Sequence, residues 1–243
     1  MSNTKVVLLI VEGELDRYFY REYLGSFFAS CFEGGDIKYR VTSRDVLARH
    51  EPNGIKYSIE AQLESALDEH KLELDDILYI AHLCDTDGSY LEEGDFLINQ
   101  DDSLNFDQNY KYVLSNAKIY AKSLDYRDQL IASWNVKKRN QAELKNCKKI
   151  KGIPYRLYYN SMFLEHFLTG KIPRYTEDKR DCIDSFFDEF CSYEDLANYA
   201  ENKKLSDDYD SSWELLKLPR NKMVSATNLN IFFEDIKLLK NSD

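Results

Sequence analysis

Three carboxylates directly follow two apolar segments of this 243-residue chain. Glu12 comes after the run Lys5–Val11, and Asp85 and Asp87 come after residues 76–84, within the sequence Asp-Thr-Asp-Gly. Both apolar segments predict strands that are buried on both faces. If these strands are parallel neighbours, the three carboxylates meet at one edge of a sheet, beyond the carboxyl ends of its strands, where ligands bind in such folds.

Carboxylates held together repel one another, and the usual remedy is a hard divalent cation with oxygen ligands. Mg²⁺ keeps several of its waters, which suits a phosphate-bearing substrate. We therefore expect Mg²⁺ or Mn²⁺ at Glu12, Asp85 and Asp87, and phosphoryl-transfer chemistry at this edge. Each motif alone has a simpler interpretation, because an acidic residue after a strand often caps a helix and Asp-x-Asp-Gly is common in turns.

The segments that must position these groups alternate between strand and helix patterns. We expect strands at 5–11, 36–43, 76–84 and 153–159, and helices at 15–28, 58–72, 110–150 (with a break near Asn135) and 162–168. This order predicts an α/β fold with a parallel sheet and helices on both faces. We expect residues 1–170 to form this α/β domain, with a charged helical insertion at about 89–150. Residues 171–243 should form a helical C-terminal region, with helices at 178–190, 193–201 and 228–239.

Composition excludes several classes of protein. The longest uncharged apolar run, Val6–Val11, is far shorter than the roughly 20 residues of a membrane span, and the first thirty residues show no signal-peptide pattern. We expect a cytoplasmic protein without membrane association. The five cysteines have no Cys-x-x-Cys spacing, so we expect reduced thiols rather than disulfides or a structural zinc site.

Positive charge is concentrated in one segment of a chain whose net charge is -11. Residues 137–156 contain eight basic residues and one acidic residue, which gives +7 there and -18 in the rest of the chain. A phosphate-contacting surface is expected at Lys137, Lys138, Arg139, Lys145, Lys148 and Lys149. The alternatives are a solvated helix face or a docking site for an acidic partner protein. In the last case the nucleic-acid contacts would fall to Lys171, Arg174, Lys179 and Arg180.

Taken together, the sequences VEGELD at 11–16 and DTDG at 85–88 resemble the TOPRIM domain of bacterial primases, type IA and type II topoisomerases, ribosomal RNA maturation nucleases and overcoming-lysogenisation-defect nucleases. The resemblance covers about residues 5–90 and extends in weaker form to 168. It implies a small Rossmann-like parallel sheet. Glu12 would then act in general acid/base chemistry or metal binding, and Asp85 and Asp87 would hold magnesium. Asp16 matches an acidic position that helps to hold a second metal in the nuclease branch.

Residues 153–168 are similar to a later block of small stand-alone TOPRIM proteins, which makes Glu165 and His166 additional site candidates. Their simpler interpretation is a charged pair on an amphipathic helix. The chain has no Walker A pattern and no zinc-binding module. The resemblance therefore implies a small magnesium-dependent endonuclease that acts on DNA or RNA, transfer RNA included.

Such a nuclease would be the effector of an antiviral defence system, controlled by an ATPase on another chain, and a homo-oligomer is compatible with this role. One alternative is a phosphatase of the haloacid dehalogenase class, in which Asp85 would be phosphorylated and Asp87 would be the acid/base. The other is a non-catalytic TOPRIM-like module that docks a partner.

Overall fold

The computed structural model describes residues 5–32, 36–48, 52–98, 112–115, 118–170 and 176–241. These residues contain a central sheet of five strands in the order β2-β1-β3-β8-β7. The strands are β1 (Lys5–Val11), β2 (Ile37–Ser43), β3 (Ile77–Asp85), β7 (Lys149–Ile150) and β8 (Ile153–Asn160). The first four in spatial order run parallel, and β7 is an antiparallel edge. The predicted α/β class with a mostly parallel sheet is thus confirmed.

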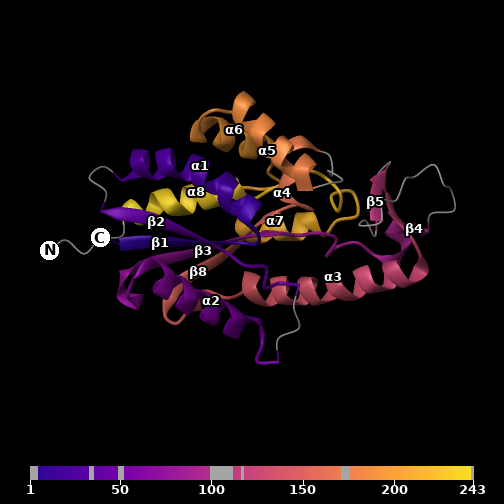
Figure 1. Ribbon diagram of the computed structural model, residues 1–243, viewed down its shortest axis with the longest axis horizontal. Helices are drawn as coiled ribbons and strands as arrows, with labels where there is room; N and C mark the ends of the chain where they lie inside the picture. The colour runs from indigo at the N-terminus through magenta and orange to yellow at the C-terminus, as the bar shows by residue number, and fades with distance from the viewer. Residues whose placement is uncertain are drawn as a thin grey trace.

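Helices cover both faces of this sheet (Figure 1). Helices α1 (Glu14–Cys31) and α8 (Leu229–Leu238) lie on one face, and α2 (Ile55–His70) and α3 (Leu124–Lys145) on the other. Helix α1 buries side chains at helical spacing, as an amphipathic helix on a sheet must: Phe19, Tyr20, Tyr23, Leu24, Phe27 and Phe28. β1 is buried along its whole length except at Lys5, which fits its central position.

The insertion differs from the prediction of a single helix over 110–150. It begins with a three-stranded sheet of order β4-β6-β5, formed by β4 (Phe96–Ile98), β5 (Tyr112–Ser115) and β6 (Lys118–Ala121). The predicted break near Asn135 is wrong, because α3 runs through that position. Trp134 and Lys137 on either side of it are both buried, and such tertiary contacts outweigh the modest helix propensity of one asparagine. Residues 99–111 of the insertion lie outside the described residues.

The C-terminal region is helical as predicted. Besides α8 it contains α5 (Thr176–Glu189), α6 (Tyr193–Lys203) and α7 (Tyr209–Leu216), of which α7 was not predicted. Short α4 (Leu164–Thr169) precedes them, and 3-10 turns occur at Leu74–Asp76, Glu93–Asp95 and Leu239–Asn241. One continuous hydrophobic core joins β1 and β3 to Phe186, Leu196, Trp213 and Phe232 of these helices. The C-terminal helices therefore share the core of the sheet.

The structure also bears on the expectations for membrane spans and for cysteines. Within the described ranges, no helix combines the length and the apolar character that a membrane crossing requires. The five cysteines all lie in described segments, and none of them forms a disulfide there.

Candidate functional site: a carboxylate cluster around a buried lysine

The carboxyl ends of β1 and β3 bring the two sequence motifs into contact. The strands are parallel neighbours, with Ile10 paired to His82. The backbone N–H of Asp85 donates a hydrogen bond of 3.1 Å to Glu12 Oε1. Asp87 joins them through a shared partner, described below. The three carboxylates singled out in the sequence are therefore gathered at one edge of the sheet.

The turn after β3 is held in place from both sides. Asp87 has a left-handed backbone conformation, with φ of 46°. A Cβ atom at Gly88 would lie 2.1 Å from the ring of Trp134, so only glycine fits beneath that indole. On the other side, Asp87 N–H donates to Met162 O at 2.7 Å, and Met162 N–H donates to Thr86 Oγ1 at 2.8 Å. The residues after β8 thus fix the backbone that carries Asp87.

The C-terminal region in turn holds the end of β8. Ser161 N–H donates to Ala226 O at 2.7 Å, and Thr227 Oγ1 donates to Asn160 Oδ1 at 3.0 Å. The side chain of Asn160 donates to Tyr20 Oη of α1 at 2.9 Å. These buried contacts lie directly before Met162, which binds the backbone of Asp87. The segment leading into α8 therefore supports the turn after β3 indirectly, through Met162.

Lys137 of α3 lies at the centre of the carboxylate cluster. Its Nζ is 2.8 Å from Glu12 Oε1 and 2.5 Å from Asp87 Oδ2. Only 1% of its side chain is exposed. A buried ammonium is tolerated when carboxylates pair with it, and these two carboxylates provide the pairing. Burial lowers the pKa of Lys137, but Asp87, Glu12 and Asp85 outweigh that effect and hold it well above the ordinary value.

This position corrects the sequence-based interpretation of Lys137 as a surface residue for phosphate contacts. A signal for its burial was present in the helix itself. Trp134, Lys137, Gln141 and Leu144 recur at helical spacing and all four are buried, which marks the face of α3 that packs against the sheet edge. Gln141 Nε2 from the same face donates to Asp85 O at 3.0 Å.

Burial and mutual repulsion disfavour the charged forms of the carboxylates in the cluster. Burial raises the pKa of Glu12 to about 8, with contributions from Asp87 and Asp45 that add to it and a contribution from Lys137 that opposes it. Burial also raises the pKa of Asp85 well above its ordinary value, and the charges of Asp16, Glu12 and Asp87 raise it further. Asp85 Oδ1 is buried, and no donor among the described residues reaches it. An oxygen in that state is a candidate ligand for a cation.

Asp16 and Glu165 form an adjoining acidic pair. Asp16 Oδ2 accepts a hydrogen bond of 3.0 Å from Gly13 N–H, which is a capping contact at the start of α1. Burial and the charge of Glu165 raise the pKa of Asp16 to about 6. Glu165 is 5% exposed, and its Oε1 lies 3.2 Å from Lys179 Nζ. His166 instead places Nδ1 3.3 Å from Ser161 O, and burial lowers its pKa.

The donor chemistry of the cluster fits a hard cation, since the groups are carboxylate oxygens and one of them is buried without a partner. In the present arrangement, however, the single ammonium of Lys137 pairs with both Glu12 and Asp87. Within the described segments, no three side chains of metal-binding type are already gathered around one point. Lys137 is the cation that this chain itself supplies to the cluster.

The other predicted basic residues are dispersed. Lys145 is largely buried and pairs with Asp210 and Glu214, at 3.4 and 3.1 Å. Exposed positions remain at Lys138, Arg139, Lys148 and Lys149. The alternative surface is divided as well: Lys179 pairs with Glu165, Arg180 lies over the ring of Tyr18, and Lys171 and Arg174 fall outside the described residues.

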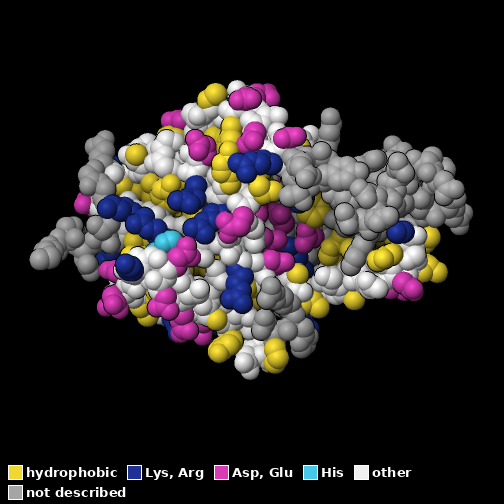
Figure 2. Space-filling view, viewed as in Figure 1, with side chains coloured by type: hydrophobic (Ala, Val, Ile, Leu, Met, Phe, Trp, Pro, Cys, Tyr) yellow, Lys and Arg dark blue, Asp and Glu magenta, His cyan; other side chains and the backbone are white. Residues whose placement is uncertain are grey.

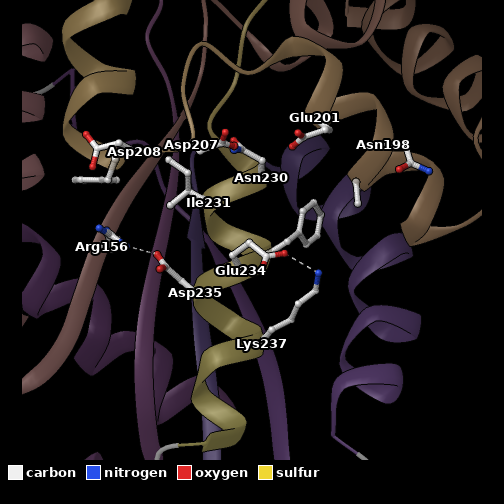
Figure 3. Close-up of a pocket in the computed structure, with 13 residues that line it drawn as sticks. Arg156, Asn198, Glu201, Asp207, Asp208, Asn230, Ile231, Glu234, Asp235 and Lys237 are labelled. Atoms are coloured by element: carbon white, nitrogen blue, oxygen red, sulfur yellow. Dashed lines mark hydrogen bonds and ion pairs between the residues drawn. The ribbon is translucent and has the colours of Figure 1, made fainter.

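A separate polar pocket of about 570 Å³ lies beside α6, α8 and β8 (Figure 3). Four of its five carboxylates already form ion pairs: Asp235 with Arg156, Glu234 with Lys237, and Glu201 and Asp207 with Lys204. It shares no residue with the carboxylate cluster. We therefore take the cluster as the candidate functional site.

The cluster can bind a cation at its carboxylates, exchange protons at Glu12 and place one ammonium group beside a substrate anion.

Comparison with known proteins yields no matching family model, no matching curated protein and no matching solved structure.

Proposed function

We propose that this chain is a TOPRIM-type nuclease that hydrolyses phosphodiester bonds of DNA or RNA with Mg²⁺ or Mn²⁺. The observation that carries the proposal is the contact between Asp85 N–H and Glu12 Oε1, which joins two motifs 73 residues apart in the sequence. Both motifs follow adjacent parallel strands, at the edge where α/β folds bind ligands. The resemblance of VEGELD and DTDG to the TOPRIM domain assigns nuclease chemistry to this arrangement.

The proposed roles follow from position and environment. Asp85 and Asp87 hold the cation, and the unpartnered Asp85 Oδ1 is the first ligand we assign. A bound cation would neutralise charge on the phosphoryl oxygens and lower the pKa of a water molecule. Glu12, whose pKa is about 8, exchanges protons readily near neutral pH and is suited to general acid/base work. Asp16, together with Glu165, would hold a second cation.

Lys137 has a role in either state of the site. Without a cation it keeps Glu12 and Asp87 together. With substrate bound, an ammonium in this place would pair with a non-bridging phosphate oxygen. The proposal also includes cytoplasmic action as a defence effector controlled by an ATPase on another chain. Its support is the sequence, which has no Walker A pattern of its own.

The direct test is cleavage of single-stranded DNA, duplex DNA, RNA and transfer RNA by the purified chain with Mg²⁺ or Mn²⁺. Asp85→Asn and Glu12→Gln should each abolish cleavage. Asp68→Asn is the matched control, because Asp68 is an exposed carboxylate on α2 outside the cluster. Calorimetry with Mn²⁺ should show binding to the wild type and the control but loss of binding to Asp85→Asn.

The proposal is wrong if the wild type cleaves none of the four polymers with either metal, or if Asp85→Asn cleaves as fast as the wild type. Transfer of phosphate from a small phosphomonoester to Asp85, with no effect of Glu12→Gln, would support the phosphatase alternative instead.

A further inference from the structure

A second group of cations, spread out in the sequence, is gathered by the fold. It consists of residues on α1, on β2 and directly after β2: Arg17, Arg21, Lys38, Arg40 and Arg44. We call it the α1–β2 basic surface. Figure 2 shows Lys and Arg side chains gathered around a histidine on this face of the molecule, with acidic side chains close beside them. β2 is an edge strand, so one of its sides has no neighbouring strand in the central sheet.

Contacts around the edge of β2 link the two arms of this surface, although Lys38 and Arg40 alternate with Tyr39 and so point to the other side of the strand. Tyr39 of β2 donates its hydroxyl hydrogen to Arg21 O of α1 at 3.3 Å. At the end of α2, burial lowers the pKa of His70; the charge of Glu69 opposes this effect, and the charges of Arg40 and Arg17 add to it. Glu69 beside His70 pairs with Arg17 at 3.1 Å.

Most of this positive charge is not neutralised within the chain. Arg17 has carboxylate partners in Glu69 and, at 3.9 Å, Glu14. Arg21, Lys38, Arg40 and Arg44 form no ion pair with a carboxylate in the described part of the chain. These four cations thus remain available in a chain whose net charge is -11. Positive charge without an internal partner can attract an external anion.

Both arms of the surface start at the candidate site. Arg44 N–H donates to Val11 O at 2.9 Å, directly before Glu12, and α1 begins two residues after Glu12. From Arg44, Arg40 and Lys38 follow along the strand at about 13 and 20 Å, given a rise of about 3.3 Å per residue. At about 3.4 Å per nucleotide of a strand, this length spans roughly six nucleotides.

We propose that the α1–β2 basic surface binds the phosphate backbone of the nucleic-acid substrate and leads it to the carboxylate cluster. This inference rests on the proposed nuclease function. A polyanion approaching a cluster of carboxylates needs positive charge beside its path. Four of the five cations are arginines, whose planar guanidinium groups match phosphate oxygens in pairs. The inference moves the contact surface away from residues 137–149, where two of the six predicted cations are buried or paired.

The chain offers a matched control for the test. The quadruple variant Arg21→Gln, Lys38→Gln, Arg40→Gln and Arg44→Gln removes four positive charges from the α1–β2 surface. The control variant also removes four positive charges, from α3 and from the start of β7: Lys138→Gln, Arg139→Gln, Lys148→Gln and Lys149→Gln. β7 is the edge of the sheet opposite β2. Circular dichroism and thermal unfolding serve to check that both variants fold like the wild type.

The measurement is fluorescence anisotropy of a labelled single-stranded DNA and its RNA equivalent, titrated with protein in EDTA at several KCl concentrations. Each lost phosphate contact flattens the slope of log affinity against log salt by about 0.7 for single strands. We expect the α1–β2 variant to flatten the slope by roughly 2 to 3 units and the control to leave it unchanged. The inference is overturned if the control flattens the slope instead, if neither variant does, or if the wild type binds neither probe.

Cleavage separates this inference from the proposed function. An unchanged slope, together with cleavage that depends on Asp85, would reject only the surface. A flattened slope in a chain that cleaves none of the polymers would reject the nuclease and leave a nucleic-acid-binding surface.

Discussion

The ammonium group of Lys137 lies 2.5 Å from the carboxylate of Asp87, in the interior of the carboxylate cluster. Lys137 belongs to α3, at the end of the insertion, whereas Asp87 belongs to the turn after β3. The insertion therefore contributes a charged group to the site. Charge balance at the site depends on how α3 packs.

Replacement of Lys137 by methionine should destabilise the metal-free protein, because Glu12 and Asp87 lose their buried partner. Breaking a buried ion pair by removing one partner typically costs about 3–5 kcal/mol. A divalent cation should offset part of this loss, so Mn²⁺ should raise the melting temperature of Lys137→Met more than that of the wild type. Lys138→Met, at the next and exposed position of α3, is the control. Equal melting temperatures of Lys137→Met and wild type without metal would contradict the argument.

Gly88→Ala should disrupt the turn that carries Asp87. The added Cβ would lie 2.1 Å from the Trp134 ring, so α3 or the turn must shift. Overpacking of this kind costs about 1–3 kcal/mol, which urea denaturation can measure, and we expect cleavage to be lost with it. Gly94→Ala is the control, because no atom lies within 4 Å of its added Cβ. Wild-type stability in Gly88→Ala would show that Trp134 moves freely.

Stability of the metal-free protein should fall as the pH rises through the range in which Asp16 and Glu12 lose their protons. Their folded-state pKa values, about 6 and about 8, are raised from ordinary values of 3.8 and 4.5. The folded state therefore holds these protons more tightly than the unfolded chain. The stabilisation is complete below about pH 4 and is lost as the pH rises through 6 and then 8.

Melting temperatures recorded across this range test the prediction. Glu12→Gln should flatten the upper part of the profile and Asp16→Asn the lower part. Mg²⁺ competes with the same protons, so its affinity should rise with pH over the same interval. A wild-type profile in both variants would show that other groups control the pH dependence.

The sequence was sufficient to predict the four parallel strands of the central sheet and the meeting of its carboxylates, but not the two-residue edge strand β7, which lies at the end of the segment 110–150 predicted as a helix. β1 is uniformly apolar and buried on both faces, and the acidic motifs follow β1 and β3 directly. The helix α7 was also predictable in principle, since Tyr209, Trp213 and Leu216 recur at helical spacing behind the capping residue Asp208.

Other features depend on tertiary structure that sequence patterns do not encode. β4, β5 and β6 contain three or four residues each, too few to show a period. The spacing of Lys137 from Trp134 and Leu144 marks the buried face of α3, but Lys137 also lies in a run of basic residues that is typical of a solvated helix, and the packing of α3 against the sheet decides between the two. The α1–β2 basic surface combines residues 17–44, where five basic residues are interspersed with three acidic ones, so the excess of positive charge along the chain is only +2 over 28 residues.

The hydrogen bonds of Ala226 and Thr227 to the end of β8 give the C-terminal region a mechanical role. Through Met162 they lie only a few bonds from the backbone of Asp87. A single proteolytic cut between α7 and α8 would leave the carboxylates on their own elements. It would also free the chain end that carries Ala226 and Thr227, whose hydrogen bonds support the turn. One cut outside the site would thus loosen the turn that carries Asp87. A fragment ending at residue 170 would keep the acidic motifs but lack the hydrogen bonds from Ala226 and Thr227.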